Sequence, residues 1–296
     1  MNAVLKYPEP ALGLTYGEPA DVYHVRRLGE LSCSGIKELL RSPQHYQHWA
    51  TQPDDESTDA MLFGRAFHMA LLEPERFART YRVLPEDAPR KPSSAQRNAK
   101  KPSDDTVAAI QWWDAFERAG LLVLKPDDAE RIRAMVASVQ AHPWAKLLTQ
   151  GGQAEVSLRW IDEATGLPCK ARADYFVDGP KRFALDVKSC VDASPAGFGR
   201  AVANYTYDLQ HAHYCDGFRA NGLPLDNYIL LAIENEAPYV CQPYFLDAES
   251  EQRGYSLRAR GAEILKRCLD AGRFPGYSDD ILRLSMPAWA FKSTQE

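Results

Sequence analysis

The sequence predicts an α/β (α+β) fold in which an antiparallel meander of strands lies among helices. Three observations support this fold class. The stretches AEVSLRWID, CKARADYFV and RFALDVKS alternate or run apolar like strands between residues 153 and 189, turn-forming DEATGLP and DGPK separate them, and helical patterns precede and follow them. With 296 residues, 45% hydrophobic and 25% charged, the chain can bury one core or at most two, which excludes collagen, coiled coil and wholesale disorder.

The chain ahead of the meander divides into an arm and a mainly helical part, residues 31–150. Residues 1–30 are rich in proline and glycine and show little periodicity, so we expect an extended or partly disordered arm. Ser32 or Ser34 can cap the first helix that follows. Further helices are expected from Pro43 through Trp49, over AMLFGRAFHMALLEP, at about 104–118 and at about 127–141.

A basic segment interrupts this helical part. Residues 79–101 hold seven Lys or Arg against Glu86 and Asp87, whereas the whole chain carries a net charge of −5. Three prolines and the lack of apolar periodicity predict a mobile basic loop, which on its own indicates a solvated linker.

The part that follows, residues 151–290, is predicted to form the sheet core and a C-terminal helix. After the meander we expect helices, two more strands, a long helix and an irregular tail at 291–296. Their expected positions are 194–204, 208–221, 226–234, 239–247 and 248–271.

Composition bounds the environment and the metal chemistry. No apolar run approaches the ~20 residues that span a bilayer, so we expect no membrane association. The six cysteines are widely spaced without a C-x-x-C, which argues against zinc and an iron–sulfur cluster and favours buried thiols in a reducing cytoplasm. The acidic net charge indicates that any binding to nucleic acid must be local.

Acidic residues on the three meander strands are the first candidates for chemistry. Asp186 and Lys188 flank Val187, so strand alternation places both side chains on one face. A short hairpin would bring Asp174 beside Asp186, and Glu155 opens the preceding strand. Hard divalent ions such as Mg²⁺ prefer carboxylates, and the Val187 carbonyl could join them. The competing interpretation is a hairpin with surface salt bridges.

Three helical positions could complete such a site. His68 on an apolar helix is either a satisfied core residue or a ligand of the metal held by Asp174 and Asp186. Gln210 and Tyr214 lie four residues apart on one helix face. The neighbouring His211 and His213 are expected on a half-exposed polar face.

Five short motifs then occur in a fixed order: G-R-A-F-H at 64–68, A-E-V-S at 154–157, R-A-D at 172–174, L-D-V-K-S at 185–189 and Y-D-L-Q-H-A-H-Y at 207–214. In this order and at these intervals, the chain resembles the exodeoxyribonuclease VIII (RecE) family of phage and prophage nucleases, within the PD-(D/E)xK superfamily. The likeness spans about residues 30 to 290. It departs at Ala173, where the superfamily name expects a proline.

The resemblance implies a role for each candidate residue. Asp174 and Asp186 become metal ligands together with His68 and the Val187 carbonyl, and Glu155 serves a second metal or a bound water. Lys188 becomes the catalytic lysine, which would orient or deprotonate the water or neutralise charge. Gln210 and Tyr214 would orient Lys188, the water or the phosphate.

The resemblance also implies an architecture and an activity. We expect one restriction-endonuclease-like nuclease domain over residues 31–290, with a central mixed sheet flanked by helices. It would be a Mg²⁺-dependent 5′ to 3′ exonuclease on double-stranded DNA ends, with one or two ions and Mn²⁺ as a substitute. It would release 5′-mononucleotides and leave a single strand for annealing. The expected partners are further copies in a ring and a single-strand annealing protein.

With DNA as the expected substrate, the basic segment gains a second interpretation as the duplex entry path. Its candidate DNA-binding residues are Arg90, Lys91, Arg97, Lys100 and Lys101. Two alternatives to the exonuclease stay open: a structure-specific or site-specific endonuclease with the same core, and a catalytically silent DNA-binding module.

Overall fold

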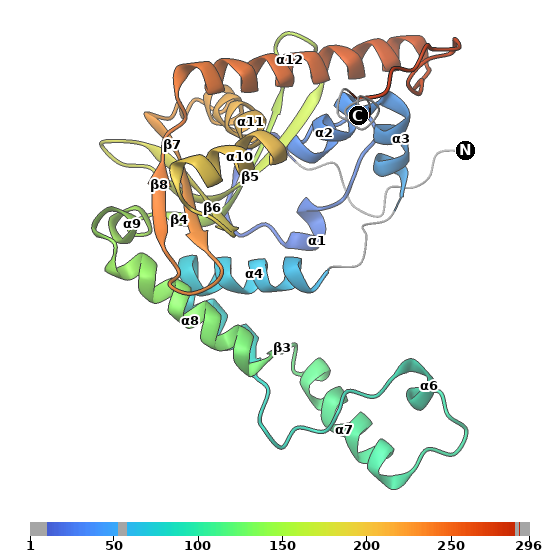
Figure 1. The fold of residues 1–296 in the computed structure, drawn as a ribbon, viewed down its shortest axis with the longest axis vertical. Helices are drawn as coiled ribbons and strands as arrows, with labels where there is room; N and C mark the ends of the chain where they lie inside the picture. Colours follow the sequence, from blue (N-terminus) through green and yellow to red (C-terminus); the bar gives the residue numbers. More distant parts are fainter. Residues whose placement is uncertain (1–10, 53–57, 288–289, 291–296) are drawn as a thin grey trace, which may run out of the picture.

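A mixed six-stranded sheet forms the centre of the protein in the computed structural model, which describes residues 11–52, 58–287 and 290 (Figure 1). The strand order is β1-β4-β5-β6-β7-β8, and β6 and β7 run parallel while the other neighbours are antiparallel. The strands are β1 (Gly13–Thr15), β4 (Gln153–Ile161), β5 (Pro168–Val177), β6 (Phe183–Cys190), β7 (Asn227–Glu234) and β8 (Cys241–Tyr244).

Helices cover both faces of this sheet, so the predicted fold class is confirmed. One layer packs α11 directly on β4 and β5, with α2, α3 and α12 beyond it. This layer contains α2 (Cys33–Arg41), α3 (Pro43–Thr51), α10 (Pro195–Tyr205), α11 (Tyr207–Ala220) and α12 (Ala248–Ala271). The opposite layer contains α4 (Asp59–Leu72), α5 (Pro74–Thr80), α8 (Pro126–Ala141) and α9 (Pro143–Leu148).

Local sequence chemistry explains where the helices begin. Of the two serines considered for α2, Ser32 is the cap, because its side chain accepts a hydrogen bond from the Gly35 N–H. Pro43 stands in the first turn of α3, as predicted, and Ser42 caps that helix. The meander of β4, β5 and β6 is antiparallel throughout, so the prediction for residues 153–189 is confirmed.

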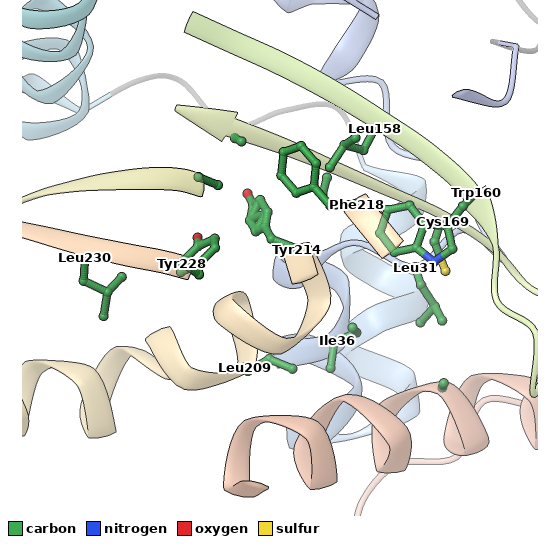
Figure 2. Packing of buried hydrophobic residues seen from close by; sticks show 14 of the residues in the cluster. Leu31, Ile36, Leu158, Trp160, Cys169, Leu209, Tyr214, Phe218, Tyr228 and Leu230 are labelled. Atoms are coloured by element: carbon green, nitrogen blue, oxygen red, sulfur yellow. The ribbon is translucent and has the colours of Figure 1, made fainter. Parts of the chain in front are cut away.

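Two hydrophobic clusters, one on each face of the sheet, hold the layers together. Between the sheet and α11, the first cluster includes Leu158, Trp160 and Phe218, which are labelled in Figure 2. The second cluster packs Phe67 and Met135 against the other face. Because β6 and β7 contribute to both clusters, their near-continuous apolar sequence is that of strands buried on both faces.

Residues 11–30, within the segment 1–30 for which the sequence predicts an extended or partly disordered arm, contain two short elements. They form β1, which pairs with β4, and the single-turn helix α1 (Ala20–Tyr23). Two buried ion pairs hold this segment to the sheet. Glu18 pairs with Arg159 at 2.9 Å, and Glu30 pairs with Lys170 at 2.9 Å. Residues 1–10 and the tail at 291–296 lie outside the described residues.

The basic segment 79–101 is likewise not a plain loop. It contains β2 (Tyr81–Val83), which pairs with β3 (Leu122–Leu124), and α6 (Ser94–Arg97). Together with α7 (Asp104–Arg118), α6 forms an arm that projects away from the sheet (Figure 1). The Trp113 indole N–H donates to the Pro89 carbonyl at 3.0 Å, which fastens the segment to α7.

All six cysteines lie in the described ranges and none forms a disulfide. Cys169, Cys241 and Cys268 are buried and the others half-buried, as the sequence suggests. Across the described chain, no helix combines the length and apolar character needed to traverse a bilayer.

Candidate active site

The site forms where strands β5 and β6 part. Their antiparallel pairing runs from Val177 opposite Phe183 to Tyr175 opposite Leu185 and then stops. One step further, the same register places Asp174 opposite Asp186. Two carboxylates facing each other repel, which disfavours continued pairing at this point.

Glu155 extends this row of acids to a third strand. It stands opposite Asp174 between two regular pairs of the β4–β5 ladder. Its backbone is left-handed, with φ of 53°, which is uncommon for a residue other than glycine and concentrates at functional sites. As a consequence, Ala154 and Val156 pack into opposite core clusters although strand alternation would put them on one face. We call Glu155, Asp174 and Asp186 the acid rung.

Backbone and imidazole groups hold Asp174. Its Oδ2 accepts a 2.8 Å hydrogen bond from the Val187 N–H and lies 3.6 Å from Nδ1 of His68 on α4. Burial raises the pKa of Asp174, and the Lys188 charge and the Val187 N–H oppose this rise. His68 of α4 and the Val187 N–H of β6 therefore both lie against Oδ2 of Asp174.

Asp186 is the most deeply buried member of the acid rung, with 3% of its side chain exposed. Its Oδ1 accepts a 2.7 Å hydrogen bond from the Gln210 amide, and its Oδ2 lies 2.7 Å from the Lys188 ammonium. The contact with Lys188 is an ion pair without hydrogen-bond geometry, so Oδ2 has no directed donor among the described residues. Burial first, and then the Asp174 charge, raise the pKa of Asp186 to about 6 against the opposing effect of Lys188.

Lys188 is held as a cation between Asp186 and an aromatic ring. Burial lowers the pKa of its ammonium, but Asp186 and Asp174 outweigh burial and raise that pKa overall. The Nζ atom also lies 4.8 Å from the centre of the Tyr207 ring on α11. Asp186 and Lys188 point to one side of β6, as strand alternation predicts.

Burial favours the uncharged forms of His68 and Glu155. Burial and the nearby Lys188 lower the pKa of His68 to about 4, so its ring is neutral at pH 7 and can act as a ligand. Burial and the Asp174 charge raise the pKa of Glu155 to about 7, although Arg172 opposes this rise from 3.6 Å.

The two predicted α11 residues occupy different surroundings. Gln210 contacts Asp186 rather than Lys188, so it orients a carboxylate. Tyr214 lies on the sheet side of α11, and its ring stacks on Tyr228 with centres 6.0 Å apart (Figure 2). Burial first, with charges that include Asp186, raises the pKa of Tyr214 well above its usual value.

His211 and His213 are buried, which makes the expected half-exposed polar face wrong. His213 has no exposed surface and its Nε2 lies 3.0 Å from the Lys170 carbonyl oxygen. His211 packs edge-on against Tyr228 and Tyr255. Both faces of α11 are covered because α12 packs on the side that helical periodicity alone leaves open.

Sequence reasoning missed two residues that touch the site. Tyr207 lies one helical turn before Gln210, and this spacing could have placed it on the same face. Arg172 lies two residues before Asp174 and contacts Glu155, while its Nη2 also meets Glu18 at 3.3 Å. No sequence signal connects Glu18 to this strand, because the contact spans 154 residues.

The proposed DNA-binding residues of the basic segment are not part of this site. Arg97 pairs with Asp114 at 2.6 Å and with Glu117 at 3.6 Å. Lys91 lies over the Trp113 ring, with Nζ 5.3 Å from its centre. Arg90, Lys100 and Lys101 are exposed on the α6–α7 arm.

The acid rung fits a hard divalent cation in donor type and in charge. Asp186 pairs with the Lys188 ammonium, Glu155 lies 3.6 Å from the Arg172 guanidinium that it shares with Glu18, and the buried Oδ2 of Asp186 lacks a directed donor. In the described ranges, no three His, Cys, Asp or Glu side chains are grouped so that they could hold a metal ion. The oxygens of Asp174 and Asp186 instead contact Val187, Gln210 and Lys188.

The mixed sheet, the opposed aspartates and the lysine two residues after the second aspartate are features of the PD-(D/E)xK class. The chain belongs to the family described as "PDDEXK-like domain of unknown function (DUF3799)", whose profile matches residues 32–284. No curated protein matches the chain.

A solved structure supports the fold. A protein from Eubacterium rectale, described as a "Putative exonuclease", aligns with a TM-score of 0.54 at 13% identity, covering 93% of this chain and 98% of its own. The structure of SSO0001 aligns at a TM-score of 0.28 and 15% identity, covering 71% and 87%, which is too low for a conclusion. At such identities the first likeness concerns architecture alone.

Proposed function

We propose that this protein is a Mg²⁺-dependent exodeoxyribonuclease that degrades linear double-stranded DNA from its ends. The observation that carries the proposal is the acid rung with Lys188 paired to its innermost member at 2.7 Å. An ion pair buried to this extent costs desolvation and is weak evidence of a purely stabilising role. It is better explained by chemistry on an anionic substrate.

The residues that would hold the metal are Asp174, Asp186, His68 and the Val187 carbonyl, with Glu155 serving a second ion or a water. When bound, Mg²⁺ would neutralise phosphate charge and lower the pKa of a nearby water. Contacts within the chain already hold these side chains in place. Val187 and Gln210 fix the carboxylates of Asp174 and Asp186, and neutral His68 presents a ring nitrogen beside Asp174.

The ion pair between Lys188 and Asp186 indicates how Lys188 would act in hydrolysis. Of the three roles that the sequence left open, stabilisation of negative charge fits best, because Asp186 keeps the side chain an ammonium. A cation fixed beside the scissile phosphate stabilises the charge that grows in the transition state. An ammonium can also orient the attacking water, but it cannot accept the proton of that water.

The finer features of the activity rest on the resemblance to the exodeoxyribonuclease VIII (RecE) family. They are 5′ to 3′ polarity, release of 5′-mononucleotides and delivery of a single strand to an annealing protein, with the chain acting in a ring of copies. The structural neighbour from Eubacterium rectale is described as a "Putative exonuclease", and the proposal assigns that class of activity to this chain.

The exposed basic residues of the α6–α7 arm are proposed to contact the duplex. Because Arg97 is neutralised by Asp114, the contact is assigned to Arg90, Lys91, Lys100 and Lys101. Such contacts would position the duplex without reading its sequence.

The form of the DNA substrate tests the proposal. Linear duplex labelled at its 5′ or 3′ end and supercoiled circular DNA are incubated with the protein and Mg²⁺. We expect loss of linear duplex only, with immediate release of the 5′ label as a mononucleotide. Nicking or linearisation of the circle would instead indicate an endonuclease, and binding of DNA without hydrolysis would indicate a silent module.

A further inference from the structure

A column of four aromatic rings leads from the core to the surface beside Lys188. Tyr244 stacks on buried Phe198 with centres 5.4 Å apart, and Phe198 lies 6.1 Å from Tyr207. Tyr207 in turn stacks on Tyr205 at 5.7 Å with an interplanar angle of 25°. The column ends at Tyr205, which is 61% exposed.

The backbone between the two outer rings is constrained. Thr206 joins α10 to α11 in the left-handed conformation, with φ of 52° and ψ of 50°. This conformation is rare for a β-branched residue and persists only where the surroundings impose it. The strained junction lets Tyr205 and Tyr207, two residues apart on different helices, stack face to face.

Two lysines from different elements flank these rings. Lys188 lies over Tyr207 at 4.8 Å, and the Lys37 ammonium of α2 donates a 2.6 Å hydrogen bond to the Tyr205 carbonyl. An exposed, rigidly backed ring bordered by cations is an arrangement that binds single-stranded nucleic acid, because bases stack on the ring and phosphates meet the cations.

We propose that Tyr205 is a stacking platform for an unpaired DNA base beside the phosphodiester to be cleaved. The assignment to DNA rests on the proposed nuclease function. Tyr207 positions the platform relative to Lys188, since it contacts both the outer ring and the ammonium. Stacking tolerates every base, so the platform would hold a frayed strand without sequence preference.

Fluorescence of 2-aminopurine tests this proposal without requiring catalysis. A short duplex with an unpaired overhang that carries 2-aminopurine is titrated with the protein in EDTA. We expect quenching with wild type and with Tyr205→Phe, which keeps the ring. Tyr205→Ala should abolish the quenching and raise Kd about tenfold. Tyr277→Ala, at a ring that is 78% exposed elsewhere, is the matched control and should behave as wild type.

Either of two results would overturn the platform: no quenching with wild type, or equal quenching with Tyr205→Ala. Absence of quenching with wild type is also the result expected if the exposed Tyr205 ring binds a protein instead of DNA. Failure of the nuclease proposal is distinguishable. A wild-type protein that hydrolyses no DNA in Mg²⁺ or Mn²⁺ but shows Tyr205-dependent quenching retains the platform and loses the nuclease function. Hydrolysis of DNA together with quenching that does not depend on Tyr205 would retain the nuclease function and exclude the platform.

Discussion

Oδ2 of Asp174 accepts a 2.8 Å hydrogen bond from the backbone N–H of Val187, so a side chain occupies the place where β5 and β6 cease to pair. This contact ties the first aspartate of the acid rung to the strand that carries the second. It therefore couples the integrity of the sheet to the geometry of the site.

Two substitutions of Asp174 separate these effects. Asp174→Asn keeps an oxygen acceptor for Val187 and should unfold in urea at the wild-type midpoint or higher in EDTA, because charge repulsion with Asp186 is relieved. Asp174→Ala leaves the N–H without its acceptor and should lower the free energy of unfolding by about 1–3 kcal/mol. Equal stability of the two variants would contradict the structural role of this hydrogen bond.

Lys188 is expected to act on turnover rather than on binding. Lys188→Ala should lower kcat at least about 100-fold, since a fixed cation no longer stabilises the transition state, while Kd for DNA changes by only a few fold. Single-turnover hydrolysis and a binding titration measure the two quantities. Lys181→Ala, at an exposed lysine just ahead of the same strand, is the control. Normal digestion by Lys188→Ala would remove this residue from the mechanism.

Divalent metal should stabilise the folded protein. Wild type in saturating Mg²⁺ or Mn²⁺ should melt at a higher Tm than in EDTA, because a ligand bound only to the folded state adds stability, about 2.7 kcal/mol at 100 times Kd. Asp186→Asn should show little such shift, since it loses a charged ligand. The measurement is a melting series against metal concentration, and equal shifts in the two proteins would place the metal elsewhere.

Salt dependence tests the basic segment. Replacing Arg90, Lys91, Lys100 and Lys101 with Ser should weaken DNA binding and flatten the slope of log Kd against log salt, by about 0.9 for each phosphate that is no longer neutralised. Arg97→Ser is the matched control, because that guanidinium is already paired with Asp114. An unchanged slope in the fourfold variant would exclude this surface from DNA binding.

Buried His213 should make stability depend on pH. Burial first, then Arg258, lower the pKa of His213 to about 3, against 6.5 unfolded. The unfolded chain thus binds the proton more readily, and stability present above pH 6.5 is lost as pH falls toward 3. His213→Gln keeps an N–H for the Lys170 carbonyl and should lose about 2 kcal/mol less than wild type between pH 7 and pH 5. Parallel pH profiles from urea unfolding would contradict this.

Much of the framework could be predicted because it is written in local patterns. The alternation in β4, β5 and β6 and the caps at Ser32 and Ser42 act over a few residues. The two-residue spacing of Asp186 and Lys188 likewise predicted that both side chains lie on the same side of β6.

What could not be predicted depends on distant partners. The left-handed backbone of Glu155 and the end of the β5–β6 ladder arise from the assembled sheet. The ordered segment 11–30 is held by Glu18 on Arg159, a contact between residues far apart in the chain. His213 has no exposed surface because other elements cover α11 on both sides. Helical period identifies faces but not what will cover them.

In the proposed function, the acid rung with Lys188 is a metal-dependent nuclease centre. Its most direct measurement is hydrolysis of linear duplex by wild type, Asp186→Asn and Asp178→Asn, each with Mg²⁺ and with EDTA. Asp178 lies on the same hairpin with half of its side chain exposed, which makes it the matched control. We expect wild type and Asp178→Asn to digest the duplex with Mg²⁺ but not with EDTA, and Asp186→Asn to digest it in neither. Equal digestion by Asp186→Asn, or digestion in EDTA, would contradict the proposed function.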